Sequence, residues 1–211
     1  MARRLRGAVG LLKVGFQLFT AEGPGAVQKL AGLGFDIFLD LKFHDIPNTV
    51  AGAVAAAASL PNVRMLTLHT TGGLAMMRAA REALAGQKNR PALLGVTILT
   101  SLDAQGLREV GISGSPTARV VSLARLAKEA GLDGVVSSAH EARAIRKACG
   151  PKFLIVVPGV RPLSAAANDQ SRVATPSEAI RAGADYLVIG RPITGAASPR
   201  AAAVAIAAEL A

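Results

Sequence analysis

Short apolar segments alternate with alanine-rich segments along almost the whole chain, and this alternation limits the possible folds more than any other feature. The apolar segments have the length of buried strands, and the alanine-rich segments have the length of helices. Strands that alternate strictly with helices pair in parallel, so the pattern predicts an α/β fold built from βαβ units. We expect seven strands, at residues 11–16, 35–41, 64–69, 92–99, 134–138, 153–157 and 186–189.

The helices between these strands are expected to end at glycine in three places. Gly131, Gly150 and Gly183 stand where a helix usually has its C-terminal glycine. Seven strand–helix pairs favour a (β/α)8 TIM barrel over an open sheet, although one of the eight strands is missing. We expect helices at residues 25–33, 50–59, 74–84, 116–131, 139–148, 176–182 and 199–210.

Three of the expected strands end in polar side chains. In a (β/α) barrel the carboxyl ends of the strands form the active-site mouth, so these side chains could meet there. They are Asp40 with Lys42, His69, and Thr97 with Thr100.

The length of 211 residues suits one domain, residues 1–211, with a full hydrophobic core. Apolar residues make up 51% of the chain and charged residues 18%, which indicates a folded protein. The longest apolar-rich run, residues 50–60, ends at Pro61 and is too short to cross a bilayer. Residues 1–8 are basic and Lys13 interrupts the apolar run that follows, so we expect no signal peptide and a cytoplasmic protein.

The net charge of +10, from 24 basic and 14 acidic residues, first suggests nucleic-acid binding. Aromatic residues make up 3% of the chain, tryptophan is absent and there is no long basic run, so neither base stacking nor phosphate tracking is favoured. A positive pocket for a phosphorylated metabolite explains part of the charge, and surface arginines explain the rest.

The cysteine and histidine residues do not form a metal-binding pattern. Cys149 is the only cysteine, which excludes a disulfide framework and a thiolate metal cluster and favours a small packed thiol. His44, His69 and His140 lack the His-Glu-x-x-His spacing. We therefore predict that the chain has no metal site.

Residues 35–50 place charged side chains at the tip of an apolar strand, where a charge is costly unless it is paired. Side chains alternate along a strand, so Asp40 and Lys42 should point to the same face. Pro47 is expected to end the strand and start a turn, which leaves Asp45 on a loop. One interpretation is a structural ion pair between Asp40 and Lys42. The other is two carboxylates around one ammonium, which suits a proton donor beside a carboxylate that repels anions.

The longer string at residues 40–49, Asp-Leu-Lys-Phe-His-Asp-Ile-Pro-Asn-Thr, resembles the signature of the orotidine 5'-phosphate decarboxylase family. The wider superfamily of phosphate-binding barrels shares only Asp-x-Lys-x-x-Asp, and the Ile-Pro-Asn-Thr tail separates the decarboxylase from its sugar-phosphate relatives. The resemblance runs from residue 12 to about residue 191. In the family, a strand carrying an aspartate and then a helix precede the Leu-Lys-Val-Gly segment seen at residues 12–15. We therefore expect the first barrel strand to be truncated or absent in this chain.

The resemblance implies decarboxylation of orotidine 5'-phosphate to UMP and CO₂, the last step of UMP synthesis, without a metal or organic cofactor. Lys42 then corresponds to the proton donor, and Asp40 to the carboxylate that crowds the carboxylate of the substrate. Lys13 corresponds to a lysine that binds the ribose and an adjacent carboxylate, although taken alone it could be a lysine that reaches to solvent. Thr100 corresponds to the residue that binds the pyrimidine, although a strand-end hydroxyl can also satisfy a turn.

The resemblance also implies a homodimer with two composite sites. Asp45, Ile46 and Thr49 correspond to residues that reach across the dimer interface into the ribose site of the other subunit. His69 fits a supporting position near the mouth, and His44 fits a loop or interface position.

Two arginine-containing segments follow the last two expected strands and suggest a phosphate site. Arg161 lies in Pro-Gly-Val-Arg-Pro, and Gly190 with Arg191 lies in Ile-Gly-Arg-Pro. Glycine lets the backbone approach a ligand and arginine offers a charge-assisted fork, at a position where barrels often bind phosphate. The polar segment between them, residues 163–172, resembles a lid, and Gln170 resembles the family glutamine that closes over the phosphate.

Three other functions remain open from the sequence. One is a metal-dependent sugar-phosphate decarboxylase or synthase of the same superfamily. Another is a non-catalytic remnant that, without its first strand, binds nucleotide but does not turn it over, or folds poorly because the barrel cannot close. The third is a basic nucleic-acid binder, which salt-dependent retention on DNA would reveal.

Overall fold

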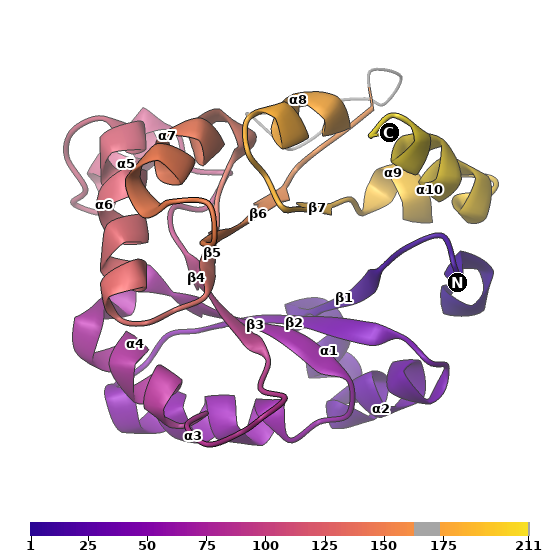
Figure 1. Cartoon of the computed structure of the whole chain (residues 1–211), viewed down its shortest axis with the longest axis horizontal. Helices are drawn as coiled ribbons and strands as arrows, with labels where there is room; N and C mark the ends of the chain where they lie inside the picture. Colours follow the sequence, from indigo (N-terminus) through magenta and orange to yellow (C-terminus); the bar gives the residue numbers. More distant parts are fainter. Residues whose placement is uncertain (163–173, 211) are drawn as a thin grey trace.

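The computed structural model describes residues 1–162 and 174–210, and its centre is a sheet of seven parallel strands (Figure 1). The strands pair in chain order from β1 to β7, and every neighbouring pair is parallel. The predicted α/β fold and its strands are thereby confirmed. The strands are β1 (Leu11–Gly15), β2 (Asp36–Phe43), β3 (Val63–His69), β4 (Ala92–Val96), β5 (Gly134–Val136), β6 (Leu154–Pro158) and β7 (Tyr186–Val188).

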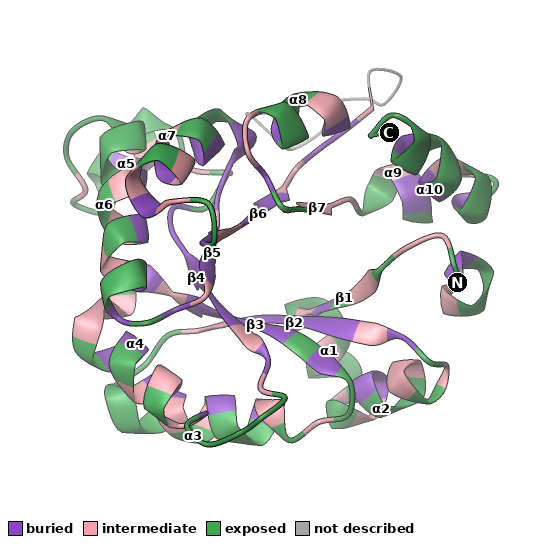
Figure 2. Ribbon diagram, viewed as in Figure 1, coloured by how far each residue is buried: buried purple, intermediate pink, exposed green. Residues whose placement is uncertain are grey.

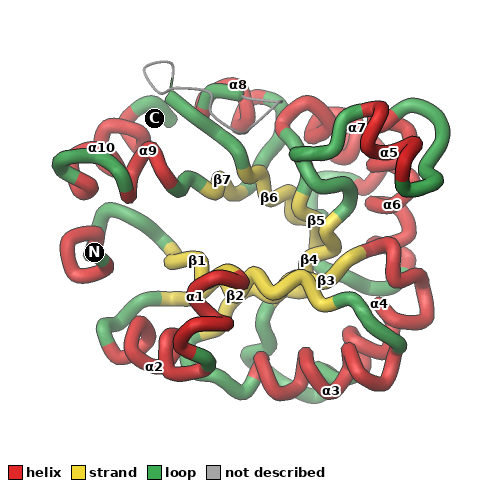
Figure 3. Tube along the Cα trace, turned by 180° about the vertical axis from the view of Figure 1, so that it is seen from behind, coloured by secondary structure: helices red, strands yellow, loops and turns green. Residues whose placement is uncertain are grey.

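Helices surround the strands on the outside, as the view from behind shows (Figure 3). None of the helices in the described ranges is long and apolar enough to cross a membrane. The α-helices are α1 (Phe16–Glu22), α2 (Pro24–Gly32), α3 (Pro47–Ala58), α4 (Gly73–Glu82), α5 (Ala104–Glu109), α6 (Pro116–Glu129), α7 (Ala139–Cys149), α8 (Pro176–Arg181), α9 (Arg191–Thr194) and α10 (Pro199–Ala208). The 3-10 helices are η1 (Ala2–Leu5) and η2 (Thr70–Gly72).

The strands curve into a nearly closed barrel with a gap between β1 and β7 (Figures 1 and 3). In the part of the chain that the structure describes, β1 pairs with β2 alone and β7 pairs with β6 alone. A cavity of about 450 Å³ lies at this gap, and its lining includes Leu11 and Val188 from the two edge strands and Ile206 from α10. The barrel fold is confirmed, and the described residues supply one strand fewer than the usual eight.

Both faces of the sheet are apolar, which buried parallel strands require. Inside the barrel, Phe38, Met65, Leu94 and Val156 form one cluster. Outside it, the residues that alternate with them pack under the helices, as the fully buried Ile37, Leu39 and Leu66 do. Each such large side chain contributes about 1.5–3 kcal/mol when it is fully buried. Figure 2 shows the buried residues concentrated on the strands and on the inner faces of the helices.

The start of α3 corrects one prediction. Pro47 begins this helix, whereas the sequence suggested a turn there and a helix from residue 50. Proline suits the first helical position, because its φ is already fixed near the helical value and its missing N–H has no partner to lose. The loop that carries Asp45 is therefore short, and it leads from the end of β2 directly into α3.

Other helix boundaries also differ from the expected ones. Helix α1 was not predicted, because it follows Gly15 directly and its first apolar residues extend the apolar run of β1. Helix α5 was not predicted either, although the carboxylate of Asp103 accepts hydrogen bonds from two backbone N–H groups at its start, which is a common N-cap arrangement. The short helix α9 was also missed, and β4 ends at Val96 where the prediction continued to residue 99. The glycines expected after helices are confirmed, since Gly131, Gly150 and Gly183 have φ values of 81°, 88° and 108°.

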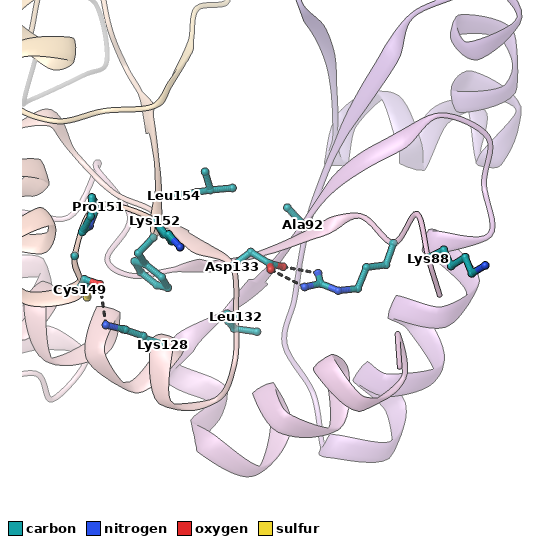
Figure 4. A pocket seen from close by; sticks show the side chains of 12 residues that line it. Lys88, Ala92, Lys128, Leu132, Asp133, Cys149, Pro151, Lys152 and Leu154 are labelled. Carbon is teal, nitrogen blue, oxygen red and sulfur yellow. Dashed lines mark hydrogen bonds and ion pairs between the residues drawn. The ribbon is translucent and has the colours of Figure 1, made fainter. Parts of the chain in front are cut away.

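A second cavity, of about 1010 Å³, lies at the end of the barrel where β4 to β6 begin (Figure 4). There the carboxylate of Asp133 accepts two hydrogen bonds from the guanidinium of Arg90, at 2.6 and 2.7 Å. Lys128 Nζ donates to the carbonyl oxygen of Cys149 at 2.8 Å. The Cys149 thiol is buried as expected, and burial raises its pKa. These contacts tie neighbouring segments together at the end of the barrel that normally serves stability.

Candidate active site

The end of β2 leaves the regular strand pattern at Lys42. Leu39 pairs with Leu66 and Phe43 pairs with Leu68, so β2 advances by four residues where β3 advances by two. This bulge puts Lys42 in the left-handed region, at a φ of 46°. A residue other than glycine held there costs of the order of 1–3 kcal/mol, and such residues concentrate at functional sites.

Thr67, on β3, holds this bulge in place. Its hydroxyl oxygen accepts a hydrogen bond from the backbone N–H of Lys42 at 2.9 Å, and its hydroxyl group donates to Asp40 Oδ1 at 3.0 Å. The side chain is fully buried. A side-chain hydroxyl therefore satisfies the Lys42 N–H at a point where the register of the two strands shifts.

Two lysines approach one carboxylate beside the bulge. Lys42 Nζ donates to Asp40 Oδ2 at 2.7 Å, and Lys13 Nζ lies 3.4 Å from the same oxygen. Lys13 comes from β1, whose Gly15 pairs with Asp40. Asp40 and Lys42 do face the same side, as the sequence predicted, and the ammonium of Lys13 is directed at Asp40. We call these residues the Lys13–Asp40–Lys42 cluster.

Asp40 is a buried carboxyl whose neighbours favour its charged form. Burial alone raises its pKa, but the hydrogen bond from Lys42, the charges of Lys42 and Lys13 and the hydrogen bond from Thr67 outweigh that effect. The pKa of Asp40 is therefore held below the ordinary value, and the group is a carboxylate at neutral pH.

The cluster lines a cavity of about 150 Å³ at the carboxyl ends of the strands. The same cavity is lined by Thr100 and Ser137, which follow β4 and β5, and by Pro158, the last residue of β6. The cavity shares Lys13, Phe38 and Val188 with the larger cavity at the β1–β7 gap, and Gly190 lines that larger one. The two cavities therefore adjoin at the barrel mouth, and their linings together include Lys13, Asp40, Lys42, Thr100 and Gly190.

Asp45, Ile46 and Thr49 lie on the short loop after β2 and in the first turn of α3. All three are exposed, and Ile46 is 66% exposed. Asp45 Oδ1 accepts a hydrogen bond from the backbone N–H of Ile46 at 2.6 Å, and no ion pair joins Asp45 to Lys42 within the described chain. The sequence suggested two carboxylates around one ammonium, but a single chain places two ammonium groups around one carboxylate.

The residues expected at a phosphate site follow β6 and β7. Arg161 is buried, and its backbone N–H donates to the carbonyl of Ala174 at 3.0 Å. Gly190 immediately precedes α9, and the exposed Arg191 is the first residue of that helix. Neither arginine lines either of the two cavities at the barrel mouth. Gln170 lies outside the described residues.

Two histidines stand beside the cluster. The rings of His44 and His69 are 5.4 Å apart between centroids and are tilted by 39°. Burial, His44 and Lys42 lower the pKa of His69, and Asp40 opposes them.

Thr97, also expected at the mouth, instead donates its hydroxyl hydrogen bond to the carbonyl of Val136 at 3.0 Å. Within residues 1–162 and 174–210, no group of three or more His, Cys, Asp or Glu side chains could hold a metal ion.

The sequence reasoning missed two polar residues at the mouth. One is Thr67, whose only signal is a single hydroxyl within the apolar strand segment Met-Leu-Thr-Leu-His. The other is Ser137, whose buried Oγ has no hydrogen-bond partner among the described residues. A buried hydroxyl in a cavity wall is expected to meet a ligand or a water molecule.

A seven-stranded parallel barrel with ion-paired lysines and an aspartate at the carboxyl ends of its strands defines a (β/α)-barrel enzyme. Comparison with known proteins identifies which one: a model of the family described as "Orotidine 5'-phosphate decarboxylase / HUMPS family" matches residues 1–206. The chain belongs to this family.

The relatives agree with that assignment. The chain is 55% identical over 210 residues to a protein of Nitrosococcus oceani named orotidine 5'-phosphate decarboxylase, covering 100% of this chain and 90% of the relative. It is 57% identical over 209 residues to a protein of the same name from Anaeromyxobacter dehalogenans, covering 99% and 90%. The crystal structure of orotidine 5'-phosphate decarboxylase from Lactobacillus acidophilus superposes with a TM-score of 0.82 at 41% identity, covering 94% of this chain and 85% of that one.

Proposed function

We propose that the chain decarboxylates orotidine 5'-phosphate to UMP and CO₂, as the last step of UMP synthesis in the cytoplasm. The observation that carries this proposal is the Lys13–Asp40–Lys42 cluster at the barrel mouth, in a chain whose relatives carry that name. The cluster offers a cation at a fixed place beside a buried carboxylate, which is what the chemistry requires.

The reaction breaks the bond between C6 of the pyrimidine and the carboxyl carbon. The electron pair stays on C6 in the plane of the ring, where ring conjugation cannot spread it. The protein must then supply the reduction of the barrier, which in enzymes is typically about 8–23 kcal/mol. Charge fixed in advance beside C6 is the means that this site offers, because it needs no reorganisation during the reaction.

Lys42 is the proposed proton donor. Its ammonium faces the developing carbanion and then transfers a proton to C6, which forms the C–H bond of UMP and leaves a neutral amine that solvent reprotonates. Asp40 fixes Lys42 through the 2.7 Å contact, and its own negative charge opposes the carboxylate of the substrate until CO₂ leaves. Lys13 shares the same carboxylate and is the proposed ribose contact. Thr100, which lines the same cavity, is the proposed pyrimidine contact.

A homodimer would complete this site. Asp45, Ile46 and Thr49 are exposed and do not line the cavities of their own chain, which supports a role in the site of a partner subunit. A carboxylate from the partner's Asp45 would give the second acid that the single chain does not supply to Lys42. It would also offset the excess positive charge of two lysines around one aspartate.

The phosphate is proposed to bind where β6 and β7 end. Gly190 lines the larger of the two mouth cavities, and Arg191 follows it with a guanidinium suited to a phosphate. Arg161 and Gln170 are further proposed members of this site. Binding of a group so far from C6 can contribute to the rate if its binding energy is used to close the site around the base.

The direct test is the loss of orotidine 5'-phosphate absorbance with purified chain in the presence of EDTA. We expect turnover that the chelator does not reduce and that yields UMP and CO₂ in equal amounts. A chain that acts on sugar phosphates in an EDTA-sensitive way, and not on orotidine 5'-phosphate, would contradict the proposal. A chain that binds UMP but releases no CO₂ would indicate the binding remnant instead.

A further inference from the structure

We propose that Thr67 is a positioning residue for the proton transfer, because its hydroxyl fixes both the backbone of Lys42 and the carboxylate of Asp40. This inference rests on the decarboxylase function proposed above. Thr67 touches neither the substrate nor C6 in this scheme, and it acts through the two residues that do.

The backbone of Lys42 is held by the Thr67 hydroxyl. Lys42 sits in a left-handed conformation within a bulge where no residue of β3 is in register with residues 40–42. Its N–H is satisfied by Thr67 Oγ1 at 2.9 Å. A lysine held at an unfavourable φ keeps that conformation only while its contacts hold it, so loss of the acceptor frees the segment that aims the ammonium.

The two carboxylate oxygens of Asp40 bind different partners. Oδ1 accepts from the Thr67 hydroxyl at 3.0 Å, and Oδ2 receives Lys42 at 2.7 Å and Lys13 at 3.4 Å. A carboxylate held at one oxygen only can turn about its last torsion angle, which is soft. The hydroxyl of Thr67 therefore fixes the plane of the carboxylate and keeps the other oxygen directed at both lysines.

The burial of Thr67 makes this arrangement sensitive to the hydroxyl. Thr67 is fully buried, and no other described residue bonds both the Lys42 backbone and the Asp40 side chain. Removal of the hydroxyl leaves a partly buried donor, the Lys42 N–H, without its acceptor, which is more harmful than the loss of an exposed hydrogen bond. A valine keeps the shape of threonine and removes only the hydrogen-bonding group.

The experiment compares Thr67→Val, Thr67→Ser and a matched control, Thr70→Val. Thr70 is also fully buried and also donates one hydroxyl hydrogen bond, to the carbonyl of Val96 at 2.9 Å, but it does not contact the cluster. We expect T67V to lower kcat for orotidine 5'-phosphate by about ten-fold or more, with KM changed by less than about three-fold. T67S should recover most of the parent kcat, and T70V should retain kcat even if it loses comparable stability.

A pH profile separates positioning from a general loss of stability. The charged and titratable groups that face Asp40 are Lys13 on β1, Lys42 on β2 and His69 on β3. The Thr67 hydrogen bond favours the charged carboxylate, so its removal raises the pKa of Asp40. The acid limb of kcat/KM should therefore move to higher pH in T67V, stay in place in T70V, and return toward the parent in T67S.

A titration of the Asp40 carboxyl carbon by ¹³C NMR, assigned with Asp40→Asn, measures the change in the pKa of Asp40 directly and needs no turnover. If the parent chain does not act on orotidine 5'-phosphate, the proposed function fails and this titration still tests the positioning. If T67V does not fold, Thr67→Cys takes its place, because a thiol keeps the volume and bonds weakly. An unchanged Asp40 titration in T67V or T67C would overturn the inference. So would a kcat that T67S fails to restore, or a fall in kcat as large in T70V as in T67V.

Discussion

Lys13 and Lys42 direct their ammonium nitrogens at the same atom, Asp40 Oδ2, from distances of 3.4 and 2.7 Å. The two lysines come from neighbouring strands, and the bulge at the end of β2 brings the second one back toward the first. Two cations around one buried carboxylate leave a net positive charge at the mouth of the barrel. That charge favours an anionic substrate, and it also favours a second carboxylate from outside the chain.

Replacement of Lys42 by alanine should abolish turnover and leave the fold intact. General acid catalysis alone typically contributes about 10²–10⁴-fold, and Lys42 is also the cation nearest to the proposed carbanion. Steady-state kinetics and circular dichroism of K42A measure the two halves of this prediction. Lys29→Ala is the matched control, since Lys29 also pairs with an acid at 2.8 Å but lies on the exposed face of α2. Near-normal rates in K42A would refute the role of Lys42.

The contribution of Asp40 to stability should depend on pH in one direction. Its pKa in the folded chain lies below the ordinary value of 3.8, so the unfolded chain binds the proton more readily. The stabilisation is therefore complete above the ordinary value and is lost as pH falls through the lower, folded one. We expect Asp40→Asn to cost about 1–3 kcal/mol at pH 7, because two lysines lose their shared partner.

Urea unfolding of the parent and D40N between pH 3 and pH 8 measures this dependence. The difference in unfolding free energy should stay constant down to about pH 5 and shrink below about pH 4. Asp36→Asn is the control, because Asp36 makes an exposed ion pair with Arg64 at 2.8 Å. A difference between parent and D40N that grows toward low pH would contradict the sign.

His69 should be neutral at pH 7 and should resist protonation in the folded chain. Burial, the neighbouring His44 and the charge of Lys42 all lower its pKa below the ordinary 6.5. The unfolded chain then binds the proton more readily, so stability falls as pH drops through 6.5 toward the folded pKa. NMR titration of the histidine ring carbons, assigned with His69→Gln, checks the direction. The loss of stability between pH 7.5 and pH 5.5 should be smaller in H69Q, and a His69 that titrates above 6.5 would contradict it.

The strands were predictable because each is an apolar run bounded by glycine, proline or polar residues, and the helices because alanine-rich segments fill the space between them. The boundary at Gly15 was not, since an apolar run that continues from a strand into a helix carries no local signal of the change. The position of Pro47 could have been predicted from its preference for the first helical turn.

The sequence named the residues of the Lys13–Asp40–Lys42 cluster but did not give their geometry. Regular alternation along a strand gave the right prediction that Asp40 and Lys42 meet, although the real cause is a bulge with Lys42 at a φ of 46°. Such a conformation is set by a contact on another strand, the Thr67 hydroxyl, which no local pattern reveals. The expected second acid, Asp45, is exposed in a single chain because its loop turns outward into α3.

Replacement of Arg191 by alanine should weaken binding of the substrate through its phosphate. Charge-assisted hydrogen bonds to phosphate are about twice as strong as neutral ones, so kcat/KM should fall by about ten-fold to a hundred-fold. Kinetics with orotidine 5'-phosphate and with orotidine measure the effect. The loss should appear with the phosphorylated substrate and be largely absent with the nucleoside. Arg64→Ala, an exposed arginine at the start of β3, is the control and should leave both rates unchanged.

Mixing two inactive variants tests whether the active site is shared between two copies of the chain. Lys42→Ala and Asp45→Ala should each be inactive alone, because one lacks the proton donor and the other lacks the acid offered to a partner. In a hybrid dimer, one site carries both defects and the other carries neither. Free exchange at equal concentrations makes half of the dimers hybrids, so about a quarter of the parent activity should return. Light scattering establishes the dimer, and differently tagged subunits verify exchange. No recovery after verified exchange would show that Asp45 acts within its own chain.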